Sequence, residues 1–341
     1  MSELEGRRIL ISGGCGSIGS ELVTKVLKQD PEVVRILDAD EGALFNLKQQ
    51  LADTDRVRFL LGNVRDRERL EMALEGIDVV FHAAALKHVE INEYNPFETV
   101  QTNVQATQNL IRMALEEEVD SFVTISTDKA SNPVSVMGAT KLLSERLVIA
   151  ANAYKGSRST RFGCVRFGNV LGSNGSVIPI FKDQIRQGGP VTVTDPDMTR
   201  FVMPLSEAAE LVLAAHERMT SGEVFVLKMP SLRVGDLAKA MIDRFAPSFG
   251  YELEEISIDV IGARPAERVH EKLIAKEESR QSRELDDMFV ILPQIDVPGY
   301  EAQNYEEADP VESEYTSADQ ELLTESEILD LLDRADITAQ P

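Results

Sequence analysis

The chain has few cysteines, a shortage of positive charge and no long apolar run. Its 341 residues include two cysteines, Cys15 and Cys164, which give neither a disulfide framework nor the spacing of metal ligands. We therefore expect a reducing, cytoplasmic environment and no metal site. No apolar run approaches the roughly 18–20 residues that a membrane span needs. The acidic-led start of the chain, residues 1–8, does not resemble a signal peptide.

Acidic residues outnumber basic ones by 58 to 35, which gives a formal net charge of −23. Proteins bind nucleic acids and anionic membrane surfaces through basic patches. This balance therefore argues strongly against nucleic acid and against a membrane as partners. Much of the acidic excess lies in residues 301–341, where Arg334 is the single basic residue.

Short apolar strands alternate with helical segments along the first half of the chain. Six segments predict strands that are apolar throughout: 8–12, 33–37, 57–61, 78–82, 121–126 and 163–167. Apolar residues recur with helical spacing between them, at 20–29, 67–74, 96–116 and 138–152. Apolar strands separated by helices are typical of a parallel sheet covered on both faces. We therefore expect an α/β fold with a doubly wound Rossmann sheet.

A glycine cluster follows the first predicted strand. Gly13, Gly16 and Gly19 are spaced Gly-x-x-Gly-x-x-Gly, and Ser17 and Ile18 complete the loop. Glycine lets the backbone turn sharply and approach a pyrophosphate, which then sits on the free N–H groups of the helix N-terminus. Because the cluster lies between a strand and a helix, it predicts a dinucleotide-binding site.

The second predicted strand ends at Asp38, about 20 residues after the glycine loop, where an acidic residue contacts the ribose in dinucleotide-binding folds. A carboxylate at this position accepts hydrogen bonds from the ribose hydroxyls and repels a 2′-phosphate, so it favours NAD over NADP. Asp40 could serve in its place.

The amino-acid composition changes after Gly168, where glycine and proline become frequent. We expect an NAD-binding Rossmann domain over 1–170, to which segments around 205–228 return. A smaller substrate lobe is expected mainly over 171–300.

The acidic tail 301–341 is expected to begin with a polar linker, 305–317. It should end in a short helix, in which Thr324 and Glu327 have the spacing of a capping box.

Two segments carry a resemblance to a known family. Residues 81–89 read Phe-His-Ala-Ala-Ala-Leu-Lys-His-Val, and residues 126–141 read Ser-Thr-Asp-Lys-Ala-Ser-Asn-Pro-Val-Ser-Val-Met-Gly-Ala-Thr-Lys. They resemble extended short-chain dehydrogenases, in particular the UDP-N-acetylglucosamine 4,6-dehydratases and CapD-like polysaccharide biosynthesis proteins. The resemblance covers about residues 7–280. Most extended dehydrogenases have a Tyr-x-x-x-Lys pair here, whereas this chain has Met137 and Lys141.

For the cofactor, the resemblance implies NAD held by several further residues. Ala83 and Ala84 would let the cofactor lie against the backbone. Asn63 and Val64 are similar to the adenine-edge contact of the superfamily, and Lys141 would hydrogen-bond the nicotinamide ribose.

The proton chemistry needs a substitute for the missing tyrosine, because the thioether of Met137 cannot take a proton from a sugar hydroxyl. Thr127, Asp128 and Lys129 directly follow a predicted strand, at the edge where open α/β sheets bind ligands. An adjacent carboxyl and amine suit acid–base work. The resemblance implies that Thr127 bonds O4, that Asp128 is the acid that expels water, and that Lys129 assists at C5. Asp128 could also take the first proton.

Three later motifs also resemble the family: 165–179, 198–201 and 262–271. Together with the turn 173–176, they imply contacts to the sugar and diphosphate. The residues to which the resemblance gives these substrate contacts are Lys87, Asn169, Arg200, Arg264 and Glu271. Of these, Arg200 and Arg264 would hold the diphosphate.

The resemblance implies an NAD-dependent UDP-N-acetylglucosamine 4,6-dehydratase of glycan biosynthesis, which would form a UDP-4-keto-6-deoxy sugar. Since extended dehydrogenases usually associate, a homo-oligomer is expected. A 4-epimerase, or a dehydratase that also inverts C5, is the first alternative. A catalytically silent Rossmann protein that senses dinucleotide ratios is the second. Loss of the tyrosine fits that alternative, and retention of Thr127, Asp128 and Lys129 argues against it.

Overall fold

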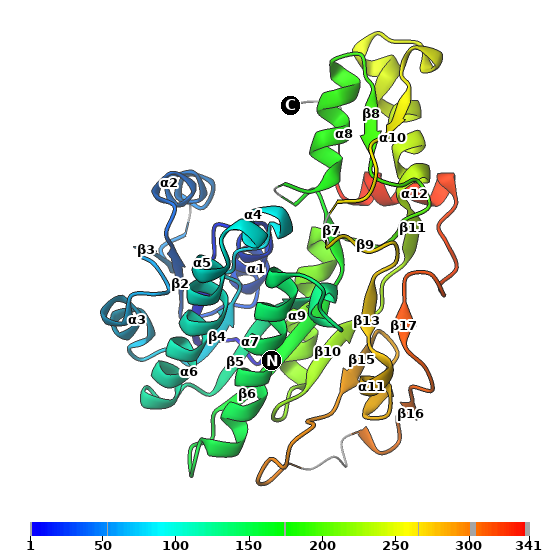
Figure 1. The fold of residues 1–341 in the computed structure, drawn as a ribbon. Helices are drawn as coiled ribbons and strands as arrows, with labels where there is room; N and C mark the ends of the chain where they lie inside the picture. Colours follow the sequence, from blue (N-terminus) through cyan, green and yellow to red (C-terminus); the bar gives the residue numbers. More distant parts are fainter. Residues whose placement is uncertain (1, 53, 174, 265, 301–304, 338–341) are drawn as a thin grey trace.

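A large, mostly parallel sheet forms the centre of the molecule (Figure 1). The computed structural model describes residues 2–52, 54–173, 175–264, 266–300 and 305–337. The parallel strands are β1 (Arg8–Ser12), β2 (Val33–Asp38), β3 (Val57–Leu61), β4 (Val79–His82), β5 (Ser121–Thr127), β6 (Arg161–Phe167) and β10 (Val224–Leu227). Their order in the sheet is β3-β2-β1-β4-β5-β6-β10. The order in which successive strands join the sheet therefore reverses between β1 and β4, and the predicted Rossmann topology is confirmed.

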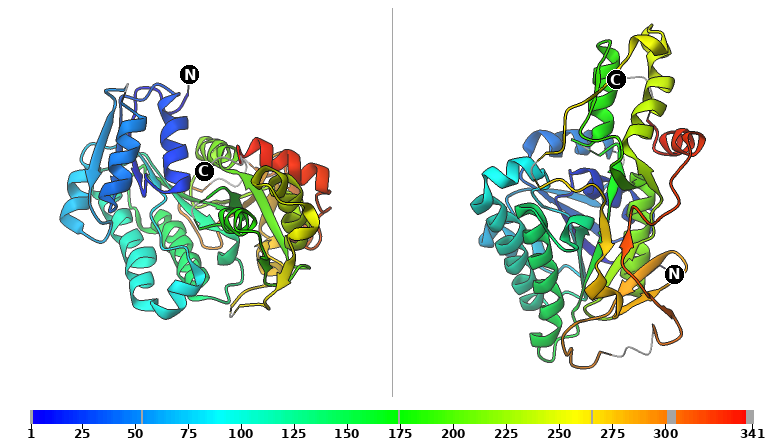
Figure 2. Two further views of the ribbon diagram at one scale, coloured as in Figure 1. Left: turned by 90° about the horizontal axis from the view of Figure 1, so that it is seen from above. Right: turned by 45° about the vertical axis from the view of Figure 1, so that its right-hand side comes forward.

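Helices cover both faces of this sheet. They are α1 (Ser17–Leu27), α2 (Glu41–Gln50), α3 (Arg67–Leu74), α4 (Val89–Tyr94), α5 (Pro96–Thr99), α6 (Ala106–Glu116), α7 (Val136–Tyr154) and α9 (Leu205–Arg218). Contacts join α1 to α9, and separately join α3 to α6 and α6 to α7. The view from above shows these two groups on opposite sides of the sheet (Figure 2). The helix predicted over 96–116 contains a π-helical segment, η1 (Val100–Gln105), between α5 and α6.

A second, smaller core lies beyond one end of the sheet. It is built by α8 (Val177–Arg186), α10 (Val234–Phe249) and α12 (Glu325–Arg334), together with the paired strands β8 (Val191–Val193) and β12 (Ile258–Val260). The short helix η3 (Leu253–Glu255) follows α10 and has no buried residue. Figure 1 shows α8 and α10 projecting from the sheet, with α12 across their base. A three-stranded sheet of β7 (Asn169–Leu171), β9 (Thr199–Pro204) and β11 (Ser231–Arg233) lies between the two cores.

The C-terminal third returns to the central sheet more than expected. Strand β15 (Met288–Ile291) pairs antiparallel with β10, and β14 (Ser282–Glu284) and β16 (Asp309–Pro310) extend the same sheet. The short helix α11 (Lys276–Ser279) precedes β14. Thus part of the segment expected in the substrate lobe is built into the central sheet.

The prediction of a polar linker over 305–317 is wrong. This segment contributes β16 to the central sheet, and β17 (Tyr315–Thr316) pairs with β13 (Lys272–Ile274). Tyr305 is buried, and the ring of Tyr315 packs against Phe201 and Phe289. These two aromatic side chains therefore anchor the segment to the core, which its acidic composition did not predict.

The predicted terminal helix is confirmed as α12. The hydroxyl of Thr324 accepts from the backbone N–H of Glu327, whose carboxylate in turn accepts from the backbone N–H of Thr324. The buried residues Ile328, Leu331 and Leu332 attach the helix to the second core. Residues 301–304 and 338–341 of the predicted tail lie outside the described residues.

Candidate active site

The glycine loop joins β1 to α1 and packs tightly against the segment after β4. Gly13 has φ +69°, and a Cβ atom there would lie 2.5 Å from the backbone nitrogen of Ala84. A Cβ atom on Gly19 would collide with the carbonyl oxygen of Gly13. Helix α1 begins at Ser17, and its N-cap, Gly16, provides no side-chain hydrogen bond to the first turn. The loop thus brings a glycine backbone and a helix N-terminus together, which is the arrangement that binds a pyrophosphate.

Asp38 ends β2 beside this loop. Its carboxylate accepts from the backbone N–H of Cys15 at 2.9 Å and from that of Asp40 at 3.2 Å. The alternative residue, Asp40, caps α2 by accepting from Ala43 N at 2.9 Å. Burial, followed by the charges of Asp38 and Asp40, raises the pKa of Cys15 to about 12, so the loop cysteine is a neutral thiol. The geometry therefore favours Asp38 over Asp40 as the carboxylate that faces the loop.

The end of β4 supports the cofactor side of the site. His82 is buried between the hydroxyls of Ser12, 2.7 Å from Nδ1, and Thr107, 3.0 Å from Nε2. Burial, with a smaller effect of Lys141, lowers the pKa of His82 to about 3. The imidazole is therefore neutral and structural. The side chain of Asn103 accepts from Leu86 N and donates to Leu86 O, which fixes the loop after Ala83 and Ala84.

Three other residues were predicted to contact the cofactor or the substrate. Asn63 and Val64 follow β3, where Asn63 is exposed and Val64 is buried. Lys87 is exposed, and partial burial of its ammonium lowers its pKa. Their contacts to a cofactor or a substrate stay predictions.

Thr127, Asp128 and Lys129 form a compact hydrogen-bonded group at the carboxyl end of β5. The hydroxyl of Thr127 donates to Asp128 Oδ1 at 2.7 Å. Lys129 Nζ donates to both carboxylate oxygens of Asp128, at 3.1 and 3.3 Å. Asp128 has no exposed surface, whereas 26% of the Lys129 side chain is exposed. A buried carboxylate is thus linked to a hydroxyl and an ammonium that can exchange protons with it.

Helix α7 brings Met137 and Lys141 to the same region. Met137 is buried, with 4% of its surface exposed. Lys141 Nζ donates to the carbonyl of Ile125 at 2.5 Å. Burial, only partly opposed by Glu145 and Cys164, lowers the pKa of Lys141 to about 8. The spacing of the Tyr-x-x-x-Lys pair is preserved, but the position of the phenol holds a side chain that cannot carry a proton.

Glu271 and Arg200 reach this group from the C-terminal half of the chain. Glu271 directly precedes β13, which packs on the short helix η2 (Asp128–Ala130). Its Oε1 lies 3.5 Å from Lys129 Nζ and 3.9 Å from Arg200 Nε. Arg200 also donates to the carbonyls of Thr199 and Val269 and pairs with Glu267 at 3.4 Å. Two residues predicted to bind substrate therefore contact the acid–base group or each other.

The remaining predicted residues lie further out. Asn169 begins β7 and is half-buried. The side chain of Arg264 is 57% exposed and lies 4.0 Å from Glu90 on α4. Asn174, in the predicted substrate turn, and Pro265, in the last motif, lie outside the described residues.

One residue of the site was missed at the sequence level. The hydroxyl of Ser317 contacts Thr199 Oγ1 at 2.7 Å and accepts from Glu271 N at 2.9 Å, while Ser317 N donates to Glu271 O at 2.9 Å. Ser317 lies in the segment predicted as a linker, and no motif signals it. Only the pairing of β17 with β13 reveals that it holds the backbone of Glu271 in place.

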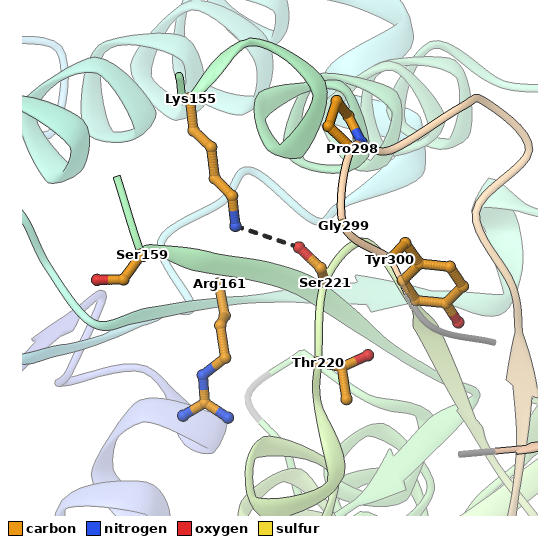
Figure 3. Close-up of a pocket in the computed structure, with 8 residues that line it drawn as sticks. All are labelled: Lys155, Ser159, Arg161, Thr220, Ser221, Pro298, Gly299 and Tyr300. Carbon is orange, nitrogen blue, oxygen red and sulfur yellow. Dashed lines mark hydrogen bonds between the residues drawn. The ribbon is translucent and has the colours of Figure 1, made fainter. Parts of the chain in front are cut away.

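A small polar hollow lies at the opposite edge of the sheet (Figure 3). Lys155 and Arg161 line it, and Lys155 Nζ donates to Ser221 Oγ at 3.4 Å. Arg161 is the first residue of β6, whereas Thr127 pairs with Phe167 at the last residues of β5 and β6. The hollow is therefore separate from the acid–base group.

Comparison with known proteins identifies the family of this chain and a solved structure with the same fold. Residues 9–293 match the family described as "Polysaccharide biosynthesis protein". The chain belongs to this family. A solved structure described as Pen from Bacillus thuringiensis is similar to this polysaccharide biosynthesis protein, with a TM-score of 0.90 and 39% identity. The match covers 97% of this chain and 98% of the other.

Three curated relatives of this family member differ in their descriptions. A Campylobacter jejuni protein described as UDP-N-acetylglucosamine 4,6-dehydratase (inverting) is 41% identical, over 85% of this chain and 84% of its own length. A Rickettsia rickettsii protein described as UDP-glucose 4-epimerase is 37% identical, over 84% and 82%. A Methanocaldococcus jannaschii protein, described as an uncharacterized membrane protein, is 56% identical, over 84% and 86%. In the part of the chain that the structure describes, no helix is long and apolar enough to cross a membrane.

Proposed function

We propose that the protein is an NAD-dependent nucleotide-sugar 4,6-dehydratase that acts on UDP-N-acetylglucosamine. The observation that carries this proposal is the hydrogen-bonded group of Thr127, Asp128 and Lys129, which contacts α7, the helix that carries Met137. Oxidation of C4 alone needs one proton acceptor, whereas dehydration needs an acid and a base at C5 and C6 as well. A carboxylate and an amine in contact suit this larger task. The 41% identical relative described as such a dehydratase supports the same conclusion.

The residues around the glycine loop fit a dinucleotide. The close contact of Gly13 with Ala84 leaves no room for a side chain, and the first turn of α1 offers backbone N–H groups to a pyrophosphate. Asp38 would accept from the ribose hydroxyls, and Lys141 would bond the nicotinamide ribose. The chemistry that bound NAD⁺ supplies is a reversible store for the hydride of the sugar. NAD is preferred to NADP because a 2′-phosphate would meet the Asp38 carboxylate.

Asp128 acts first as a base. The O4 proton of the sugar passes to the Asp128 carboxylate, directly or through the hydroxyl of Thr127, which already donates to Oδ1 at 2.7 Å. This step takes over the role that tyrosine has elsewhere. It converts Asp128 into a carboxylic acid and, with the C4 hydride stored on the bound dinucleotide, would leave a ketone at C4.

Asp128 and Lys129 then act as acid and base. The ketone acidifies H5, which the amine form of Lys129 removes. Asp128 gives the proton taken from O4 to the departing 6-hydroxyl, which leaves as water. The stored hydride would return to C6 while Lys129 gives a proton to C5, so that both side chains regain their starting states. The face from which this proton returns decides whether C5 is inverted, as in the name of the Campylobacter jejuni relative.

The substrate diphosphate requires positive charge in an otherwise acidic protein. Arg264 is accessible to the diphosphate of a substrate that arrives from solvent, because 57% of its side chain is exposed. Arg200 is held beside Glu267 and Glu271, so we assign it to the sugar end of the substrate. Lys87 and Asn169 complete the proposed contacts. A homo-oligomer in the cytoplasm remains part of this proposal.

Incubation with UDP-N-acetylglucosamine and NAD⁺ in D₂O tests the function. The expected product has lost one water and carries deuterium at C5. A product of unchanged mass without deuterium at C5 would replace the dehydratase with a 4-epimerase, the activity named for the Rickettsia rickettsii relative. Tight NAD binding without turnover of any UDP-sugar would favour the silent dinucleotide sensor.

A further inference from the structure

Glu271 is a buried carboxylate with incomplete hydrogen bonding. Only 3% of its surface is exposed, and its Oε2 has no hydrogen-bond partner among the described residues. Its Oε1 faces Lys129 Nζ at 3.5 Å and Arg200 Nε at 3.9 Å. A buried carboxylate oxygen without a partner is costly and indicates a group that takes part in chemistry or binding.

Lys129 needs a proton acceptor before it can serve as a base. Burial lowers the pKa of Lys129, but the charges of Asp128 and Glu271 outweigh this effect and the opposing charge of Arg200, so the pKa is raised. Lys129 is therefore an ammonium at rest. Asp128 cannot accept its proton, because in the proposed mechanism Asp128 carries the proton from O4 at that stage. Glu271 is the other carboxylate in contact with the ammonium.

We propose that Glu271 accepts a proton from Lys129 and so generates the amine that removes H5. This inference rests on the proposed dehydratase function. The Nζ–H bond breaks, and the proton moves to a carboxylate oxygen of Glu271, which becomes a neutral acid. Lys129 then takes H5, which becomes one of its ammonium protons, gives one of these protons to C5, and recovers a proton from Glu271. No proton is gained or lost over the cycle, and no further reactant is needed. Glu271 acts through Lys129 and is a positioning residue rather than a catalytic one.

The scaffold around Glu271 keeps its carboxylate near Lys129 independently of the charge. Ser317 bonds both the N–H and the carbonyl of Glu271, and the same hydroxyl contacts Thr199. These bonds use the backbone of Glu271. E271Q should therefore keep the local fold while removing the ability to take a proton.

The test compares wild type, E271Q and E271D with UDP-N-acetylglucosamine in D₂O over a range of pH. Deuterium entry at C5 is followed by NMR, and oxidation at C4 by the absorbance of reduced nicotinamide. We expect E271Q to oxidise C4 but to exchange H5 about 10²-fold more slowly at neutral pH. The deficit should shrink as pH rises, because solvent then removes the Lys129 proton. E271D keeps a carboxylate and should stay within about tenfold of wild type.

E267Q is the matched control. Glu267 also pairs with Arg200, at 3.4 Å, but makes no ion pair with Lys129 in the described structure. It should leave the pH dependence of H5 exchange unchanged. If E271Q exchanged H5 at least as fast as wild type at neutral pH, Glu271 would be only a counter-ion, and the proposal would be overturned. The same follows if E267Q showed the same pH-dependent deficit.

Two further results keep the test decisive. If E271Q does not fold, as judged by its thermal unfolding, E271D decides alone, since loss of H5 exchange despite its carboxylate would contradict the proposal. If wild type neither exchanges H5 nor releases water, the dehydratase function fails, and this inference fails with it. If wild type exchanges H5 and releases water, and E271Q exchanges H5 as fast as wild type, only the role of Glu271 is rejected.

Discussion

Replacing Asp128 by asparagine is the sharpest mutational test of how the protein works without the tyrosine. Asparagine has nearly the same shape, and it can still accept a hydrogen bond from Thr127 or Lys129. It cannot accept the O4 proton or give a proton to the departing hydroxyl. General acid–base groups contribute about 10²–10⁴-fold to rate. Because Asp128 is fully buried and serves in two proton transfers, we expect a loss near 10⁴-fold, which is about 5 kcal/mol in activation free energy.

The assay measures kcat with UDP-N-acetylglucosamine and, separately, NAD⁺ affinity by titration calorimetry. Asp128→Asn should lose turnover and keep NAD⁺ affinity, because the glycine loop and Asp38 are untouched. Lys129→Ala should cost at least roughly 10²-fold. Met137→Ala should cost less than either, since a buried thioether contributes packing and not proton transfer. If Met137→Ala were the most damaging change and Asp128→Asn kept near-native turnover, the proposed proton path would be refuted.

Three other predictions concern the cofactor, stability and pH. NAD⁺ should bind at least about tenfold more tightly than NADP⁺, and Asp38→Ala should narrow this gap in calorimetric titrations; equal affinities for wild type would contradict the assignment. Arg166→Met should reduce the free energy of unfolding by about 3–5 kcal/mol in denaturant titrations, because it leaves the buried carboxylates of Glu145 and Glu278 without the guanidinium that pairs with them at 2.7 and 2.8 Å; a change below about 1 kcal/mol would disprove this. His82 has a pKa of about 3 in the folded protein, below its value of 6.5 in the unfolded chain, so the unfolded chain takes up the proton first as pH falls. The free energy of unfolding should therefore decrease as pH drops from 6.5 toward 3, and it should decrease less in His82→Gln.

Local sequence patterns picked out much of the candidate site because its residues are concentrated in short segments. The glycine loop and the group Thr127–Lys129 each follow a strand, and parallel strands bring their carboxyl ends to one edge of the sheet. The capping box of α12 was predictable for the same reason, since Thr324 and Glu327 are neighbours in one turn.

The rest depended on contacts between distant parts of the chain. Ser317 meets Thr199 across 118 residues, and no local pattern encodes that meeting. Arg200 was predicted as a diphosphate contact, but its position beside Glu271 follows from the bridge between their chain neighbours, Thr199 and His270. The burial of Tyr305 and the ring packing of Tyr315 were hidden by the acidic residues around them, which is why the segment 305–317 was mistaken for a linker.

The most direct test of the account is the fate of H5 and of the 6-hydroxyl. Purified protein is incubated with UDP-N-acetylglucosamine and NAD⁺ in D₂O, and the product is examined by mass spectrometry and NMR. The acid–base pair of Asp128 and Lys129 predicts loss of one water, a ketone at C4, and deuterium at C5. A product that keeps its full mass and its original hydrogen at C5 would contradict the account.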